Sequence, residues 1–135
     1  MKGLLTTTAA IEAGTGVGLL AVPSVVAQLI LGATLDAPAA VTLARVAGAG
    51  LLALGVACWL ASYDTQSCAA RGVVTGMVLY NLGAVIILAA AGIRSQPVGV
   101  ALWLVVILHT AMTVWCVTSL LKKPMQRHVP EPSTS

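Results

Sequence analysis

Charged residues are scarce in this chain, and their scarcity excludes a water-soluble globule. Only 8% of the 135 residues are charged, with four acids and seven bases, whereas 59% are hydrophobic. A soluble domain is usually about half apolar and about a quarter charged. At about 20 residues for each membrane-spanning helix, the length admits at most about six spans and no separate extramembrane domain. The composition therefore predicts an integral membrane protein.

Catalytic motifs are missing as well. The sequence holds no GxSxG, HExxH, P-loop or paired carboxylates, so we expect no enzyme. The three cysteines, Cys58, Cys68 and Cys116, form no CxxC pair, and we expect no disulfide framework. We also expect no cofactor and no metal site. The bases are scattered beside apolar runs, which indicates membrane topology rather than nucleic-acid binding.

Four long apolar runs dominate what is present. They cover residues 4–32, 39–61, 73–93 and 98–121. The first run is too long for a hydrocarbon core of about 30 Å, so we expect it to tilt, to kink at Pro23 or to begin in the interface. A signal peptide is an alternative for this run, although Glu12 interrupts it. Because short connections make consecutive helices antiparallel, residues 1–121 are predicted to form one all-α domain, an up-down-up-down four-helix bundle.

The lysines and arginines predict the orientation of this bundle. If both termini are cytoplasmic, the far side holds only Arg94 outside the spans, because Arg45 lies within one. The cytoplasmic side then holds Lys2, Arg71, Lys122, Lys123 and Arg127. This asymmetry follows the positive-inside rule. Residues 122–135 are polar and rich in proline, which predicts a disordered cytoplasmic tail.

Small residues recur at a spacing of four, which is typical of close helix packing in lipid. We predict helix contacts at these positions: Gly14, Gly18, Ala44, Gly48, Ala49, Ala53, Gly72 and Gly76. They serve either packing within the bundle or association with other chains.

Polar side chains inside the runs are the candidate site. Each run contributes to a set at similar depth, so we expect one interior polar cluster of Glu12, Arg45, Tyr80, Asn81 and His109. In one interpretation, a buried Glu12–Arg45 ion pair fixes the helix register. In a second, Glu12 or His109 binds a proton. Haem or metal ligation by His109 is a third, but Cys116 lies about 10 Å along the helix, too far to share a metal.

The sequence resembles two groups of proteins. One is a group of small, uncharacterised bacterial four-span proteins near the DoxX-like families. That resemblance is carried by Pro23, Leu31-Gly32, Ala44-Arg45-Val46-Ala47-Gly48, Ala53-Leu54-Gly55, Cys58-Trp59, Tyr80-Asn81, Trp103 and His109. It implies a bacterial inner membrane and no particular activity. The other group is the small multidrug resistance transporters, whose first helix carries a lone glutamate in a place similar to that of Glu12. Those transporters lack a buried arginine such as Arg45.

We therefore expect a non-catalytic membrane protein. It would be an accessory subunit of a larger membrane complex or a homo-oligomeric scaffold, with the lipid bilayer and other membrane subunits or further copies as its partners. The alternative is a small proton-coupled transporter that uses Glu12.

Overall fold

The computed structural model describes residues 1–94 and 98–122, and the regular structure of these residues is entirely helical. The helices are α1 (Lys2–Ala21), α2 (Pro23–Leu31), α3 (Pro38–Ala61), α4 (Cys68–Arg94) and α5 (Leu102–Leu121). Four of these described helices, all except α2, are long and apolar enough to cross a membrane. The predicted all-α, four-span fold is therefore confirmed. The predicted tail lies, from residue 123 on, outside the described residues.

The first predicted run is divided at Pro23 into a spanning helix and a short second helix. Pro23 occupies the first turn of α2, and Val22 before it leaves the helical conformation, with φ −135° and ψ 58°. Proline has no N–H to continue a helix and excludes the α conformation from the residue before it. Gly32 then ends α2 in the left-handed conformation, with φ 74°. Of the three expectations for this run, the break at Pro23 is the one observed.

Two other helix starts differ from the predicted ones. α4 begins at Cys68 rather than at residue 73, because the Ser67 hydroxyl accepts a hydrogen bond from the Ala70 N–H at 3.1 Å and so caps the helix. α5 begins at Leu102 rather than at residue 98. The chain just before it forms a turn that contacts α2.

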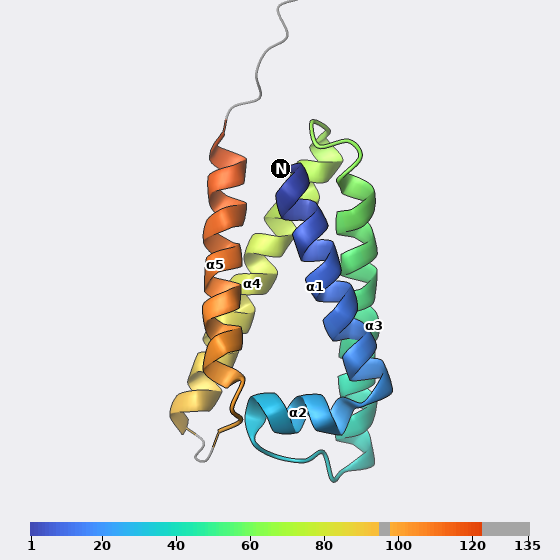
Figure 1. Ribbon diagram of the computed structural model, residues 1–135, viewed down its shortest axis with the longest axis vertical. Coiled ribbons are helices and arrows are strands. Elements are labelled where there is room, and N and C mark those ends of the chain that lie inside the picture. The colour runs from blue at the N-terminus through green and yellow to red at the C-terminus, as the bar shows by residue number, and fades with distance from the viewer. Residues whose placement is uncertain (95–97, 123–135) are drawn as a thin grey trace, which may run out of the picture.

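The spanning helices run up and down and form two pairs (Figure 1). Met1 and the last turn of α5 lie at one end of the bundle, which we call the terminal end. α1 packs most extensively against α3, and α4 against α5. The two pairs meet at the terminal end and diverge toward the opposite end, where α2 lies across the gap (Figure 1). We call this opposite end the α2 end.

Glycines bring α1 and α3 into backbone contact. A Cβ atom on Gly16 would lie 2.7 Å from the Gly48 carbonyl oxygen, and one on Gly48 would lie 2.8 Å from the Gly16 oxygen. A Cβ atom on Gly55 would likewise lie 2.9 Å from the Ala13 nitrogen. Such close approach is the main packing device where lipid replaces water.

The predicted packing positions are mostly elsewhere. Gly48 lies in the α1·α3 contact, but Gly14, Gly72 and Gly76 have open space where a Cβ would stand, and Gly18 approaches only a Val26 methyl group. Ala49 and Ala53 are exposed and Ala44 is half-buried. The reason is helical geometry: residues two apart lie about 200° around the axis, so contact at Gly16 turns Gly14 and Gly18 away from α3.

Side chains from all four spanning helices pack together at the terminal end. The buried cluster consists of Leu4, Leu5, Ala9, Cys58, Val74, Met77, Met112 and Cys116. The Arg71 guanidinium donates a hydrogen bond to the Leu120 carbonyl at 3.4 Å, which satisfies one carbonyl in the last turn of α5. The two helix pairs are therefore joined firmly at this end.

α2 joins the two pairs at the opposite end. The Ala101 N–H, just before α5, donates a hydrogen bond to the Leu29 carbonyl at 2.9 Å. Gly99 lies so close to Leu29 that any Cβ would overlap the Leu29 carbonyl oxygen. This contact explains the glycine at position 99. Through it, α2 connects the end of α1 to the start of α5.

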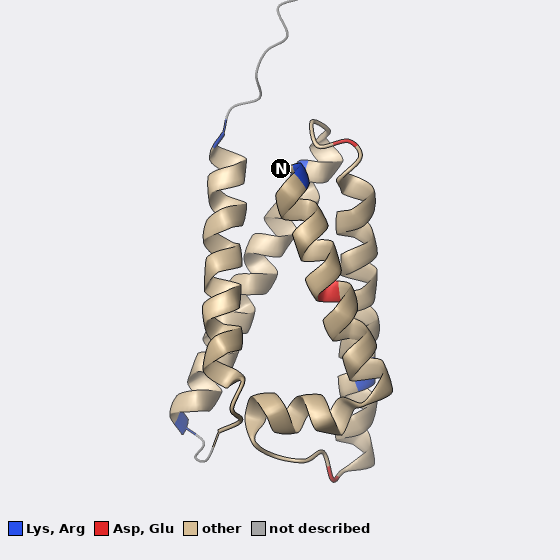
Figure 2. Cartoon of the chain, viewed as in Figure 1, with Lys and Arg blue, Asp and Glu red and all other residues tan. Residues whose placement is uncertain are grey.

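Charged side chains lie mostly near the two ends of the bundle (Figure 2). Lys2, Arg71 and Lys122 belong to the terminal end, where α1 and α4 begin and α5 finishes. Arg94 ends α4 at the α2 end. This distribution leaves a long and mostly apolar middle in the described bundle, interrupted by Glu12 on α1.

Candidate functional site

A pocket of about 610 Å³ lies between the two helix pairs, on the side of α2 that faces the bundle. All five described helices contribute to its wall, and most of the wall is apolar. Its polar side chains are Glu12 and Thr15 from α1, Tyr80 from α4 and His109 from α5. Known ligand pockets span about 300–1,000 Å³ and combine apolar walls with a few polar groups. We therefore take this pocket as the candidate functional site.

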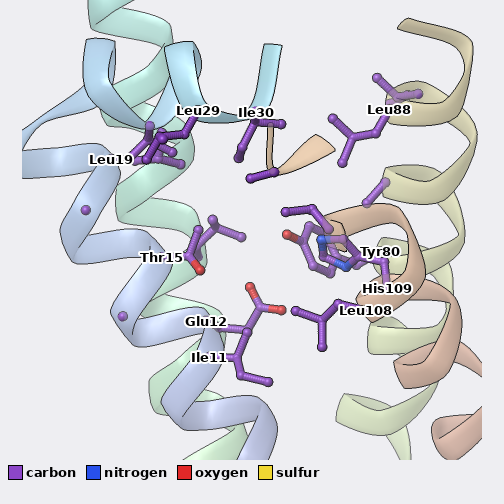
Figure 3. A pocket seen from close by; sticks show the side chains of 18 residues that line it. Ile11, Glu12, Thr15, Leu19, Leu29, Ile30, Tyr80, Leu88, Leu108 and His109 are labelled. Carbon is purple, nitrogen blue, oxygen red and sulfur yellow. The ribbon is translucent and has the colours of Figure 1, made fainter. Parts of the chain in front are cut away.

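Glu12 reaches the pocket from the middle of α1. Its side chain is only 4% exposed, and its carboxyl group points into the space between the pairs (Figure 3). Gly14 and Gly18 line the same wall without a side chain. The α1 glycines therefore do two things: Gly16 brings α3 close, while Gly14 and Gly18 leave room for the pocket.

Tyr80 and His109 form the facing wall. Their rings meet edge to face, with centroids 5.6 Å apart and planes at 80°. The Tyr80 hydroxyl and the Glu12 carboxyl are close enough for their side chains to interact across the pocket (Figure 3). Polar groups of α1 and of the α4·α5 pair thus face each other near the middle of the spanning helices.

Asn81 holds the His109 ring in place. The Asn81 Nδ2 donates to the Met77 carbonyl at 2.7 Å, so the nitrogen of the amide is identified by a partner that can only accept. The amide oxygen lies 2.7 Å from Nδ1 of His109. Because that oxygen only accepts, Nδ1 carries the proton and donates. The other ring nitrogen, Nε2, is left as an acceptor in the neutral ring.

The structure brings together four of the five predicted cluster residues and leaves Arg45 out. Glu12 and Asn81 are buried, and Tyr80 and His109 are half-buried at the pocket. Arg45 is exposed on α3, and within the described residues no ion pair joins it to Glu12. Arg45 lies two turns inside α3, so its long side chain can extend to the headgroups. The expectation of an interior Glu12–Arg45 pair is therefore not met.

Two threonines on α1 were missed by the sequence reasoning. Thr15 lies three positions after Glu12 and Thr8 four before it, so helical spacing places all three on one side of α1. Thr15 lines the pocket. Thr8 is 1% exposed, and its hydroxyl oxygen has no hydrogen-bond partner in the described chain. The spacing alone was a usable signal for both.

The described residues contain no evident set of metal ligands. Over residues 1–94 and 98–122, no three His, Cys, Asp or Glu side chains are grouped so that they could hold an ion. Cys58 and Cys116 are free and buried in the terminal core, whereas Cys68 is free and exposed.

Comparison with family models, with characterised proteins and with solved structures gave no match. The class of protein therefore follows from the fold and the site alone. The chain is a multi-pass helical membrane protein with a largely apolar pocket among its spans and a carboxyl, a phenol and an imidazole group in the pocket wall.

Proposed function

We propose that this chain binds a small amphipathic molecule in the pocket and acts as a small transporter in which Glu12 binds a proton. The pocket itself carries the proposal, because it lies among the spans and contains the one acidic side chain that any described helix holds. Ionisable residues within spans are rare and commonly mark a substrate or proton path. A purely structural carboxylate would be expected to have a basic partner, and Arg45 does not supply one.

The arrangement of the helices supports movement around the pocket. The pairs are joined by a packed core at the terminal end, but at the α2 end the contact is made by the short helix α2 and its bond to Ala101. Rigid packed pairs joined by a short segment are a common basis for domain rocking. No catalytic step is part of this proposal.

Filling the pocket tests the proposal. Leu88 lines the pocket from α4, whereas Leu79 on the same helix is 69% exposed and faces outward. We expect Leu88→Trp to remove any bound small molecule that native mass spectrometry detects on protein gently extracted from its own membrane. Leu79→Trp is the matched control and should retain that molecule. Equal retention in both variants, or no bound molecule in any of the three proteins, would contradict the proposal.

Association with another membrane chain is a second candidate function, as an accessory subunit or a self-associating scaffold. Gly72 and Gly76 favour it, because both lie exposed on α4 at a spacing of four with open space at their Cβ positions. Such a pair lets a neighbouring helix approach closely. Gly76→Leu should then release a partner seen in the native mass spectrum. Gly50→Leu, on an equally open part of α3, should leave the partner bound.

We also propose a bacterial inner membrane with both termini in the cytoplasm. Three of the described basic residues gather at the terminal end, and the sequence adds Lys123 and Arg127 after them. This bias supports a cytoplasmic terminal end. Cys68 offers a direct test, since it is exposed at the start of α4. A membrane-impermeant maleimide should label it in inverted membrane vesicles and not in intact spheroplasts, and the reverse pattern would overturn the orientation.

A further inference from the structure

The pocket has a polar end and an apolar end. Glu12, Tyr80 and His109 lie near the middle of their helices, whereas Leu29 and Ile30 of α2 close the pocket at the α2 end (Figure 3). A bound molecule would therefore place its polar group deep in the membrane and its apolar body toward α2. A phospholipid of the leaflet at the α2 end has the opposite arrangement, because its headgroup must stay at the surface.

The charge of the wall limits that polar group further. None of the described residues that line the pocket is a lysine or an arginine, and Glu12 is an acid. A carboxylate or phosphate head would lose its hydration there without gaining a cation. The wall therefore favours a neutral or cationic head over an anionic one.

The hydrogen-bonding groups of the wall limit the head group of the ligand further. The Nδ1–H group of His109 already donates to the Asn81 amide oxygen, so Nε2 of the neutral ring can only accept. The Glu12 carboxylate adds two acceptor oxygens, whereas the Tyr80 and Thr15 hydroxyls supply one donor each. Acceptors thus exceed donors at the polar end of the pocket. A ligand that fits must bring hydrogen-bond donors of its own.

We propose that the pocket binds an amphipathic primary or secondary amine, with its N–H groups shared between the Glu12 carboxylate and His109 Nε2 and its apolar body directed toward α2. This inference rests on the proposed function and names the chemical class of the ligand. A quaternary ammonium ion carries the same charge but has no N–H to donate. It leaves Nε2 unbonded and is bound more weakly.

The test compares four probes that share one apolar body: 4-phenylbutylamine, its trimethylammonium counterpart, 4-phenylbutanol and 4-phenylbutanoate. Binding to the full chain in nanodiscs is measured by isothermal titration, with empty nanodiscs as background. We expect the amine to bind about tenfold more tightly than the trimethylammonium ion, since a hydrogen bond to a charged group contributes roughly one such factor. Equal binding of these two cations would overturn the proposal, as would tighter binding of the alcohol or the acid.

Variants locate the amine on the two named groups. Glu12→Gln, which is nearly isosteric, should lower the affinity for the amine by about tenfold or more. Asp64→Asn, a carboxyl change in the loop before α4, is the matched control and should have no effect. In a histidine-labelled sample, with the resonance assigned by His109→Gln, the amine should shift the ¹⁵N signal of Nε2 far more than that of Nδ1. An unchanged Nε2 signal at saturating amine would overturn the assignment to His109.

The experiment separates this inference from the proposed function. If another probe binds best and Leu88→Trp abolishes that binding, the amine class is wrong and the ligand pocket remains. If no probe binds more tightly to loaded than to empty nanodiscs, the amine class is again wrong. The pocket itself is then decided by the mass-spectrometric comparison of Leu88→Trp with Leu79→Trp.

Discussion

The terminal half and the α2 half of this bundle are built from the same four helices, yet one is packed and the other is hollow. In the terminal half, Leu5, Met77 and Cys116 are almost completely buried among side chains from every spanning helix. In the α2 half, the same helices diverge around a pocket and are held apart by α2. Long apolar helices alone do not produce this difference, because each of the four helices runs through both halves.

Glycine position explains why α1 stays against α3 in the α2 half while the space toward the other helix pair opens. Gly16, Gly48 and Gly55 face the other helix of the α1·α3 pair, and the two backbones are in contact there. Gly14 and Gly18 are turned toward the other pair, and there they line the pocket. A small residue therefore either closes a contact or opens a space, depending on the direction in which it points. The comparison implies that stability comes mainly from the α1·α3 contact and the terminal core, and ligand binding from the α2 half.

The largest effect is expected at the glycine contact. Gly48→Leu would place a side chain against the Gly16 carbonyl and should lower the free energy of unfolding by about 3 kcal/mol or more. Gly50→Leu, two positions along α3 in open space, is the matched control and should be neutral or slightly stabilising. Unfolding by SDS titration, followed by circular dichroism, measures both. Similar losses in the two variants would mean that α1 and α3 do not meet through Gly48.

A somewhat smaller effect should separate the two halves directly. Leu5→Ala removes a side chain that is 1% exposed and should cost about 2–3 kcal/mol, because the packed core cannot collapse around the cavity. Leu88→Ala only enlarges an existing pocket and should cost less than about 1 kcal/mol. The same SDS titration applies. Equal costs would show that the pocket half is as densely packed as the core.

A third comparison concerns the buried Thr8 side chain and predicts a gain in the free energy of unfolding. The buried Thr8 hydroxyl has no partner in the described chain, so Thr8→Val should stabilise the bundle by about 1 kcal/mol. Thr110→Val is the control, since the Thr110 hydroxyl donates to the Val106 carbonyl at 2.8 Å and its loss should bring no gain. If Thr8→Val destabilises, the hydroxyl has a role, such as holding water near Glu12.

The fold was predictable because its signals are strong and additive along the chain. Long apolar runs, helix-breaking prolines and short connections predicted four antiparallel spans, and the break at Pro23 followed from the missing N–H of proline. The start of α4 was missed because Arg71 is charged and Gly72 is a weak helix former, so the apolar run begins only after them. There the Ser67 cap outweighs composition.

The site was predictable only in part, because depth in the membrane can be counted along a helix but direction around it cannot. Counting placed Glu12, Tyr80, Asn81 and His109 at one level, and the structure brings them together. It also placed Arg45 there, and Arg45 turns outward. The inward sides of α1 and α3 depend on the glycine contact between them, where Gly48 was among the predicted packing positions but Gly16 was not.

The smallest expected effect is the coupling between Glu12 and Arg45, and it tests this difference in direction. A buried ion pair would make each single substitution costly and the double substitution much less costly than their sum, with a coupling of about 3 kcal/mol. With Arg45 exposed on α3, we expect Arg45→Ala to be nearly neutral. The effects of Arg45→Ala and Glu12→Gln should then add within about 0.5 kcal/mol in a double-mutant cycle. Because Glu12 faces the pocket rather than an arginine, Glu12→Gln should change ligand binding far more than stability. A large coupling energy would instead return Arg45 to the interior and make Glu12 part of the packed half of the molecule.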